Sequence, residues 1–133
     1  MKTISDLIVR RFTRELESTP GKTVYDLFEW KTVDVLIKDY ARNKVVCDMK
    51  DLEFPVHYSQ NACDIIAAHY FRKAGVPNGV GHERSMREVA HRMVSFWVSA
   101  LLDEGLIDDE KQKQILYDEL VYLLLSQAWA PNS

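Results

Sequence analysis

The strongest constraint on the fold lies near the end of the sequence, in the run ELVYLLLSQAW at residues 119–129. In a helix, these residues would place apolar side chains around almost the full circumference, and such a helix is normally buried on all sides. A chain of 133 residues forms only a modest core. We therefore expect a surplus apolar face between Leu120 and Trp129, covered by further polypeptide or by self-association.

Charge and hydropathy exclude several classes of protein. The chain has 17 basic and 20 acidic residues and a net charge of −3, without a block of like charge. A protein that binds nucleic acid through the phosphate backbone would need a basic surplus, so nucleic acid is not an expected direct partner. The first apolar run is broken by Arg10 and Arg11, unlike a signal peptide. No run approaches the ~18 apolar residues of a membrane span. These features predict a cytoplasmic protein.

A change of periodicity marks an antiparallel hairpin over residues 28–49. Val33, Val35 and Ile37 alternate with polar residues, and after the connection ARNK, the segment VVCDM again has period two. Alternation of this kind is typical of strands with one buried face. Pro55 ends the pattern. Residues 1–22 could form a helix or a strand and are predicted to be a poorly defined arm.

The remaining residues, 59–130, are predicted to form three helices. Ser59 can cap the first, which would run to Lys73, and Ser85 with Glu88 forms a capping box for the second, which ends at Gly105. Asp108 or Asp109 begins the third. The apolar stripe of the second helix is the expected cover of the hairpin. The predicted fold class is α+β and mainly α-helical, with the hairpin followed by a three-helix, bundle-like region in a single domain, 1–133.

No set of residues has the spacing of a catalytic or metal site, so no catalytic residue is assigned. Cys47 and Cys63 are predicted to be small buried hydrophobic residues and indicate a reducing compartment only weakly. None of the histidines has the i, i+4 spacing of a helical zinc pair; they are His57, His69, His82 and His91. GVPNGVG follows a predicted helix rather than a strand, so it is interpreted as a connection and not as a phosphate loop. The basic residues of RSMREVAHR are interpreted as a solvated helix face.

Three long stretches, in this order, carry a resemblance to a known family: YSQNACDIIAAHYFRKAGVPN, GHERSMREVAHRMVSFWVSALLDEGLI and YDELVYLLLSQAWAPNS. They resemble the N-terminal region of adenosylcobalamin-dependent (class II) ribonucleotide reductases. The resemblance runs from about Phe28 to Ser133 and is strongest from Tyr58 onward.

The resemblance implies that the chain is the N-terminal structural domain of a larger enzyme. That enzyme reduces ribonucleotides to deoxyribonucleotides for DNA synthesis by radical chemistry, and its catalytic barrel, in the same polypeptide, follows the residues APNS. The radical and redox cysteines and the adenosylcobalamin site belong to the barrel, so this chain is expected to bind no cofactor and to be inactive alone. Ser133 matches a serine or threonine that contacts substrate phosphate, on condition that the barrel completes the pocket.

An alternative is a free-standing helical interaction module that has lost the barrel, with a partner docking on the apolar third helix. The sequence leaves open whether the substrate is a diphosphate or a triphosphate.

Overall fold

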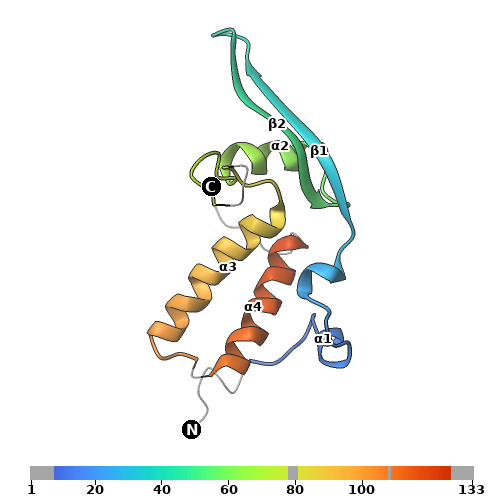
Figure 1. Cartoon of the computed structure of the whole chain (residues 1–133), viewed down its shortest axis with the longest axis vertical. Coiled ribbons are helices and arrows are strands. Elements are labelled where there is room, and N and C mark those ends of the chain that lie inside the picture. The colour runs from blue at the N-terminus through green and yellow to red at the C-terminus, as the bar shows by residue number, and fades with distance from the viewer. Residues whose placement is uncertain (1–7, 78–80, 108, 127–133) are drawn as a thin grey trace. The chain divides into compact units, whose positions relative to one another are not determined.

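The computed structural model describes residues 8–77, 81–107 and 109–126 (Figure 1). It contains two compact units, one within residues 1–27 and 90–132 and the other within residues 28–89. We describe each unit by itself, and the single-domain expectation stays a prediction. Among the described residues, no helix has both the length and the hydropathy needed to cross a bilayer.

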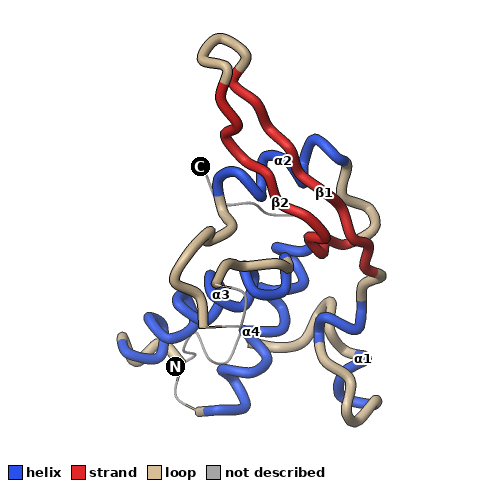
Figure 2. Tube along the Cα trace, turned by 45° about the horizontal axis from the view of Figure 1, so that its top comes forward, coloured by secondary structure: helices blue, strands red, loops and turns tan. Residues whose placement is uncertain are grey.

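The unit of residues 28–89 is built on the predicted hairpin. Strand β1 (Trp30–Asp39) pairs in antiparallel register with strand β2 (Lys44–Pro55), as Figure 2 shows. Val35 lies opposite Met49, and Ile37 lies opposite Cys47. The antiparallel hairpin is confirmed, although its second strand continues past residue 49 to Pro55.

An irregularity in β2 explains how this continuation keeps its apolar side chains inside. Between two paired positions, β1 has the single residue Asp34, whereas β2 has Lys50 and Asp51. Asp51 is in the left-handed region, with φ 53°, and its backbone N–H donates to Asp34 Oδ1 at 3.0 Å. The extra residue changes the parity of the strand, so that Met49 and Leu52 are both buried.

Helix α2 (Gln60–His69) covers the hairpin, contacting both of its strands. Ser59 caps it as predicted, since its hydroxyl accepts a hydrogen bond from the Ala62 N–H at 3.1 Å. Cys63 and Ala67 are fully buried on one face of the helix. The sequence had assigned this cover to the helix after Ser85 and had extended the present helix to Lys73; the structure gives the cover to α2.

The start of α3 (Met86–Asp103) carries the predicted capping box in modified form. Glu88 accepts from the Ser85 N–H at 3.1 Å, as the motif requires. The Ser85 hydroxyl, however, accepts from the Arg87 N–H at 3.0 Å and donates to Glu53 at 2.6 Å. This serine therefore links the helix start to β2. After the helix, Gly105 takes a φ of 74°, typical of a helix stop signal.

The other unit contains α1 (Glu15–Ser18), the 3₁₀ helix η2 (Val24–Leu27) and α4 (Glu110–Leu125), together with α3 from Ala90 onward. Asp109 caps α4 by accepting from the Gln112 N–H at 2.7 Å, which confirms one of the two predicted starts. Val94 and Val98 of α3 are fully buried in this unit's core.

The apolar half of α4 is better covered than the sequence predicts. Its described apolar residues divide into a buried set, Val121, Leu124 and Leu125, and a half-buried pair, Leu120 and Leu123. Part of the cover comes from the N-terminal segment, because the ring of Phe12 stacks on Tyr122 with centroids 5.5 Å apart. Phe12, within the segment 1–22 that the sequence predicts as a poorly defined arm, thus packs on α4. Trp129 lies outside the described residues.

Candidate functional site

A carboxylate on α4 binds the N-terminal segment through its backbone. Glu119 accepts hydrogen bonds from three successive amides, those of Arg11, Phe12 and Thr13, and from the Thr13 hydroxyl at 2.9 Å. Successive N–H groups that converge on one point form a concave anion site. Here that site is filled by a side chain of the same chain, so it serves as an anchor for residues 10–13.

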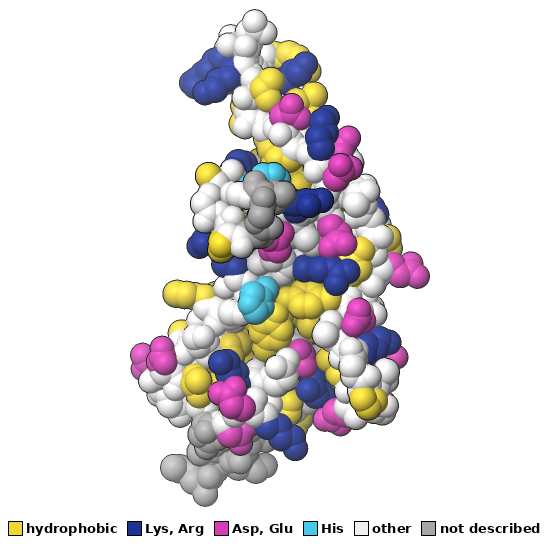
Figure 3. Space-filling view, in the orientation of Figure 1, with side chains coloured by type: hydrophobic (Ala, Val, Ile, Leu, Met, Phe, Trp, Pro, Cys, Tyr) yellow, Lys and Arg dark blue, Asp and Glu magenta, His cyan; other side chains and the backbone are white. Residues whose placement is uncertain are grey.

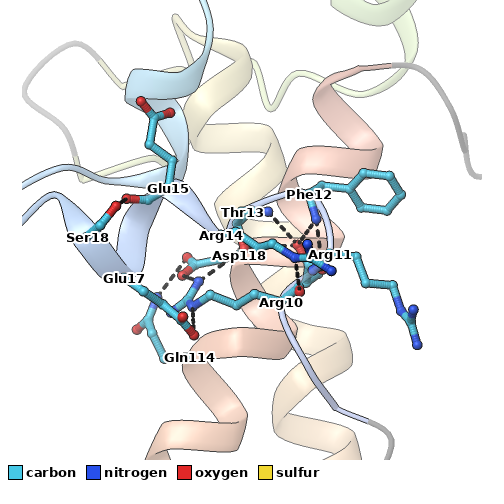
Figure 4. Close-up of polar contacts among 11 residues, drawn as sticks. Arg10, Arg11, Phe12, Thr13, Arg14, Glu15, Glu17, Ser18, Gln114 and Asp118 are labelled. Atoms are coloured by element: carbon cyan, nitrogen blue, oxygen red, sulfur yellow. Dashed lines mark hydrogen bonds and ion pairs between the residues drawn. The ribbon is translucent and has the colours of Figure 1, made fainter.

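An ion pair beside this carboxylate is nearly excluded from water. Arg10 Nη1 lies 2.8 Å from Asp118 Oδ2, and the side chains are only 12% and 6% exposed (Figure 4). Gln114 donates to the other oxygen of Asp118 at 2.9 Å, and Arg10 also donates to the Thr13 hydroxyl. Within the described residues, no buried side-chain nitrogen or oxygen lacks a hydrogen-bond partner, which is the condition under which a buried ion pair is tolerated. We call residues 10–13 with Asp118 and Glu119 the anchor.

The same unit has a solvent-open cavity of about 620 Å³ next to the anchor. Its lining includes Arg10 and Asp118, apolar side chains such as Val24 and Val98, and three residues joined by hydrogen bonds. The Tyr25 and Tyr117 hydroxyls lie 2.6 Å apart, and the Tyr117 hydroxyl lies 2.7 Å from His91 Nδ1. This volume is within the range of pockets for small ligands.

The donors and acceptors of these two hydrogen bonds are fixed when His91 is neutral and protonated on Nε2. Tyr117 then donates to His91 Nδ1, and Tyr25 donates to Tyr117. Burial raises the pKa of the Tyr117 phenol above its usual value, an effect that its hydrogen bond with Tyr25 partly opposes. The phenol is therefore a hydrogen-bond donor at neutral pH and no proton acceptor of useful strength.

The two cysteines are buried, as predicted, and unpaired by any disulfide. Burial is the largest effect on both thiols and raises the pKa of each. A reactive or redox cysteine needs its thiolate form. Neither Cys47 nor Cys63 has that character, in agreement with their interpretation as core residues.

The four histidines, all of which the structure describes, form no metal-binding cluster. His57 stacks on Phe28 with centroids 6.3 Å apart, His82 Nδ1 lies 2.9 Å from the Glu83 carbonyl oxygen, and His69 ends α2. No group of three or more His, Cys, Asp or Glu residues suited to a metal ion occurs in the described ranges.

Ser133, the one predicted substrate contact, lies outside the described residues. Sequence reasoning missed the anchor and the cavity, although two signals for the anchor were present. Arg10 and Arg11 interrupt an apolar run, and Asp118 and Glu119 interrupt the apolar half of a helix. Charges inside two apolar segments indicate that the segments pair with one another.

The described side chains thus form anchors and a core, with buried, protonated thiols, as in a structural module. The chain belongs to the class II vitamin B12-dependent ribonucleotide reductase family, as its N-terminal region, since the sequence model of that family matches residues 32–127. Vitamin B12-dependent ribonucleotide reductases are among its relatives. The protein of Streptomyces avermitilis is 33% identical over 119 residues, and the match covers 89% of this chain. The protein of Agrobacterium fabrum is 30% identical over an alignment of 157 residues, which covers 95% of this chain.

The relatives are much longer than this chain. The aligned part is 12% of the length of each of these two proteins.

Proposed function

We propose that this chain is a structural domain of a cobalamin-dependent ribonucleotide reductase, in which it packs against the catalytic barrel of the same polypeptide. The parent enzyme reduces ribonucleoside diphosphates or triphosphates to deoxyribonucleotides in the cytoplasm, for DNA synthesis. The observation that carries the proposal is the family match over residues 32–127, in relatives of which this chain spans 12%.

The chemistry of the described residues supports a structural role. The reaction needs cysteines that can exist as thiolates or lose a hydrogen atom at an accessible position, and Cys47 and Cys63 are 4% and 0% exposed. Adenosylcobalamin would supply the radical when bound. That molecule is far larger than the drug-sized ligands for which a cavity of about 620 Å³ is suited. The cavity therefore does not fit the cofactor, which we place on the barrel.

Two contacts of the proposed assembly involve residues outside the described ranges. Ser133 would contact a phosphate of the substrate once the barrel completes the pocket. Trp129 and its neighbours in 120–129 would pack on the barrel or, without it, support self-association. The half-buried Leu120 and Leu123 are the described residues available for that contact.

The proposal predicts that the isolated chain of 133 residues is inactive. Purified chain, supplied with adenosylcobalamin, a dithiol and a ribonucleotide, is expected to form no deoxyribonucleotide above a blank without protein, because it contains no accessible thiol for the radical step. Chromatography of the nucleotide products measures this. Deoxyribonucleotide formed by the pure chain, and lost in a Cys47→Ser, Cys63→Ser variant, would contradict the proposal.

A further inference from the structure

The hairpin is longer than the helix that covers it. At about 3.3 Å per residue, the ten residues of β1 span roughly 33 Å, whereas the ten residues of α2 span roughly 15 Å. Figures 1 and 2 show the strands continuing well past α2 toward their connecting turn. An isolated two-stranded hairpin is only marginally stable in water, so this uncovered end would gain stability from a partner.

The uncovered end exposes large apolar side chains. We define its distal face by four residues that are 50%, 87%, 50% and 55% exposed: Leu36, Tyr40, Val45 and Val46. Leu36 lies opposite Asp48 and Val45 lies opposite Lys38, on the side of the ribbon away from the buried Cys47. Val46 is the extra residue at the second register shift, between Cys47 and Val45. The bulge thus adds an apolar side chain to the distal face.

Charge around the distal face is unbalanced. Its acidic side chains already have cationic neighbours, since Asp39 lies 3.6 Å from Arg42 and Asp48 lies 3.8 Å from Lys50. Lys38, which lies opposite Val45 on the distal face, is exposed and has no ion-pair partner in the part of the chain that the structure describes, whereas Lys44 lies opposite Asp39. In Figure 3, yellow apolar and dark-blue basic side chains lie next to one another over this end of the hairpin. A complementary surface would be apolar at its centre and acidic at its rim.

We propose that the distal face docks on an apolar surface rimmed with carboxylates, located in the part of the reductase polypeptide outside residues 1–133. This inference rests on the proposed function. The lengths of the relatives leave most of the polypeptide outside this chain, and that part is the occupant. Lys38 pairs with its rim, and the four apolar side chains fill its centre. The hairpin would thus hold the domain to the rest of the enzyme.

Photo-crosslinking in the complete polypeptide that carries this chain tests the docking. A benzophenone amino acid at position 40 keeps an aromatic ring at the most exposed of the four residues of the distal face. We expect ultraviolet light to join it to a peptide beyond residue 133 that contains apolar and acidic residues. Val46→Ser is expected to lower the yield about tenfold, the effect of losing one buried apolar contact. Ile65→Ser, at a residue of similar exposure (48%) on α2, is the matched control and should leave the yield unchanged.

The failures of the two proposals are distinguishable. A complete polypeptide in which position 40 forms no crosslink, or links only to another copy of residues 1–133 or to a separate protein, would overturn the docking surface alone. Equal yields from the Val46→Ser and Ile65→Ser variants would also overturn it. The occurrence of the 133-residue chain by itself in its source cells would instead contradict the proposed function.

Discussion

Replacing Val35 by aspartate is expected to lower the free energy of unfolding of the hairpin unit by about 3–5 kcal/mol, because a carboxylate would be buried without a partner. Val35 is 0% exposed and lies opposite the buried Met49. Urea denaturation followed by circular dichroism would measure the loss. A loss of this size is a large fraction of the roughly 5–15 kcal/mol by which small domains are stable.

The neighbouring residue provides a matched control for this substitution. Leu36→Asp introduces the same carboxylate one position along β1, where the side chain is 50% exposed. Its expected cost is about 1–2 kcal/mol, since the charge stays hydrated and the losses are strand propensity and repulsion from Asp48, which lies opposite position 36. Equal losses from the two variants would show that the buried face of the hairpin is assigned incorrectly.

Removal of the Asp118 carboxylate is expected to have the second-largest effect, about 3 kcal/mol, on the other unit. Asp118→Ala leaves the Arg10 guanidinium, whose side chain is 12% exposed, without its nearest anion. Glu17, at 3.5 Å from Arg10, is itself exposed and compensates in part only. We expect faster hydrogen exchange at the amides of Phe12 and Thr13 as the N-terminal segment separates from α4, together with a lower denaturation midpoint.

A surface ion pair in the same unit serves as the comparison. Glu15→Ala removes the partner of Lys22, at 3.0 Å, where the two side chains are 55% and 28% exposed. Exposed pairs of this kind contribute at most about 1 kcal/mol. If Asp118→Ala costs no more than Glu15→Ala, the anchor does not hold the N-terminal segment.

The parts of the fold that could be predicted from the sequence are local in the chain. Ser59 and Asp109 cap helices through hydrogen bonds to residues three positions away, and Gly105 stops a helix through its own backbone angle. The alternation of Val33, Val35 and Ile37 likewise depends only on neighbouring residues. Such signals determine where elements begin and end, because the competing conformations are decided over one turn or one strand.

The features that were missed depend on contacts between distant residues. Arg10 and Asp118 are 108 positions apart, and their ion pair holds residues 10–13 against α4. The choice of α2 as the cover of the hairpin also depends on which helix reaches the strands, and an apolar stripe is compatible with several partners. The hydroxyl chain from Tyr25 to His91 joins three segments in the same way, so no spacing in the sequence indicated it.

The size of the polypeptide that carries these residues in its source cells is the most direct test of the proposed role. Protein captured with an antibody against residues 28–49 would be identified by intact mass and by its peptides. We expect a single polypeptide several times longer than 133 residues, whose further peptides match the rest of a vitamin B12-dependent ribonucleotide reductase. A polypeptide with the mass of the 133-residue chain, 15.4 kDa, and no further peptides would contradict that role and favour a free-standing interaction module.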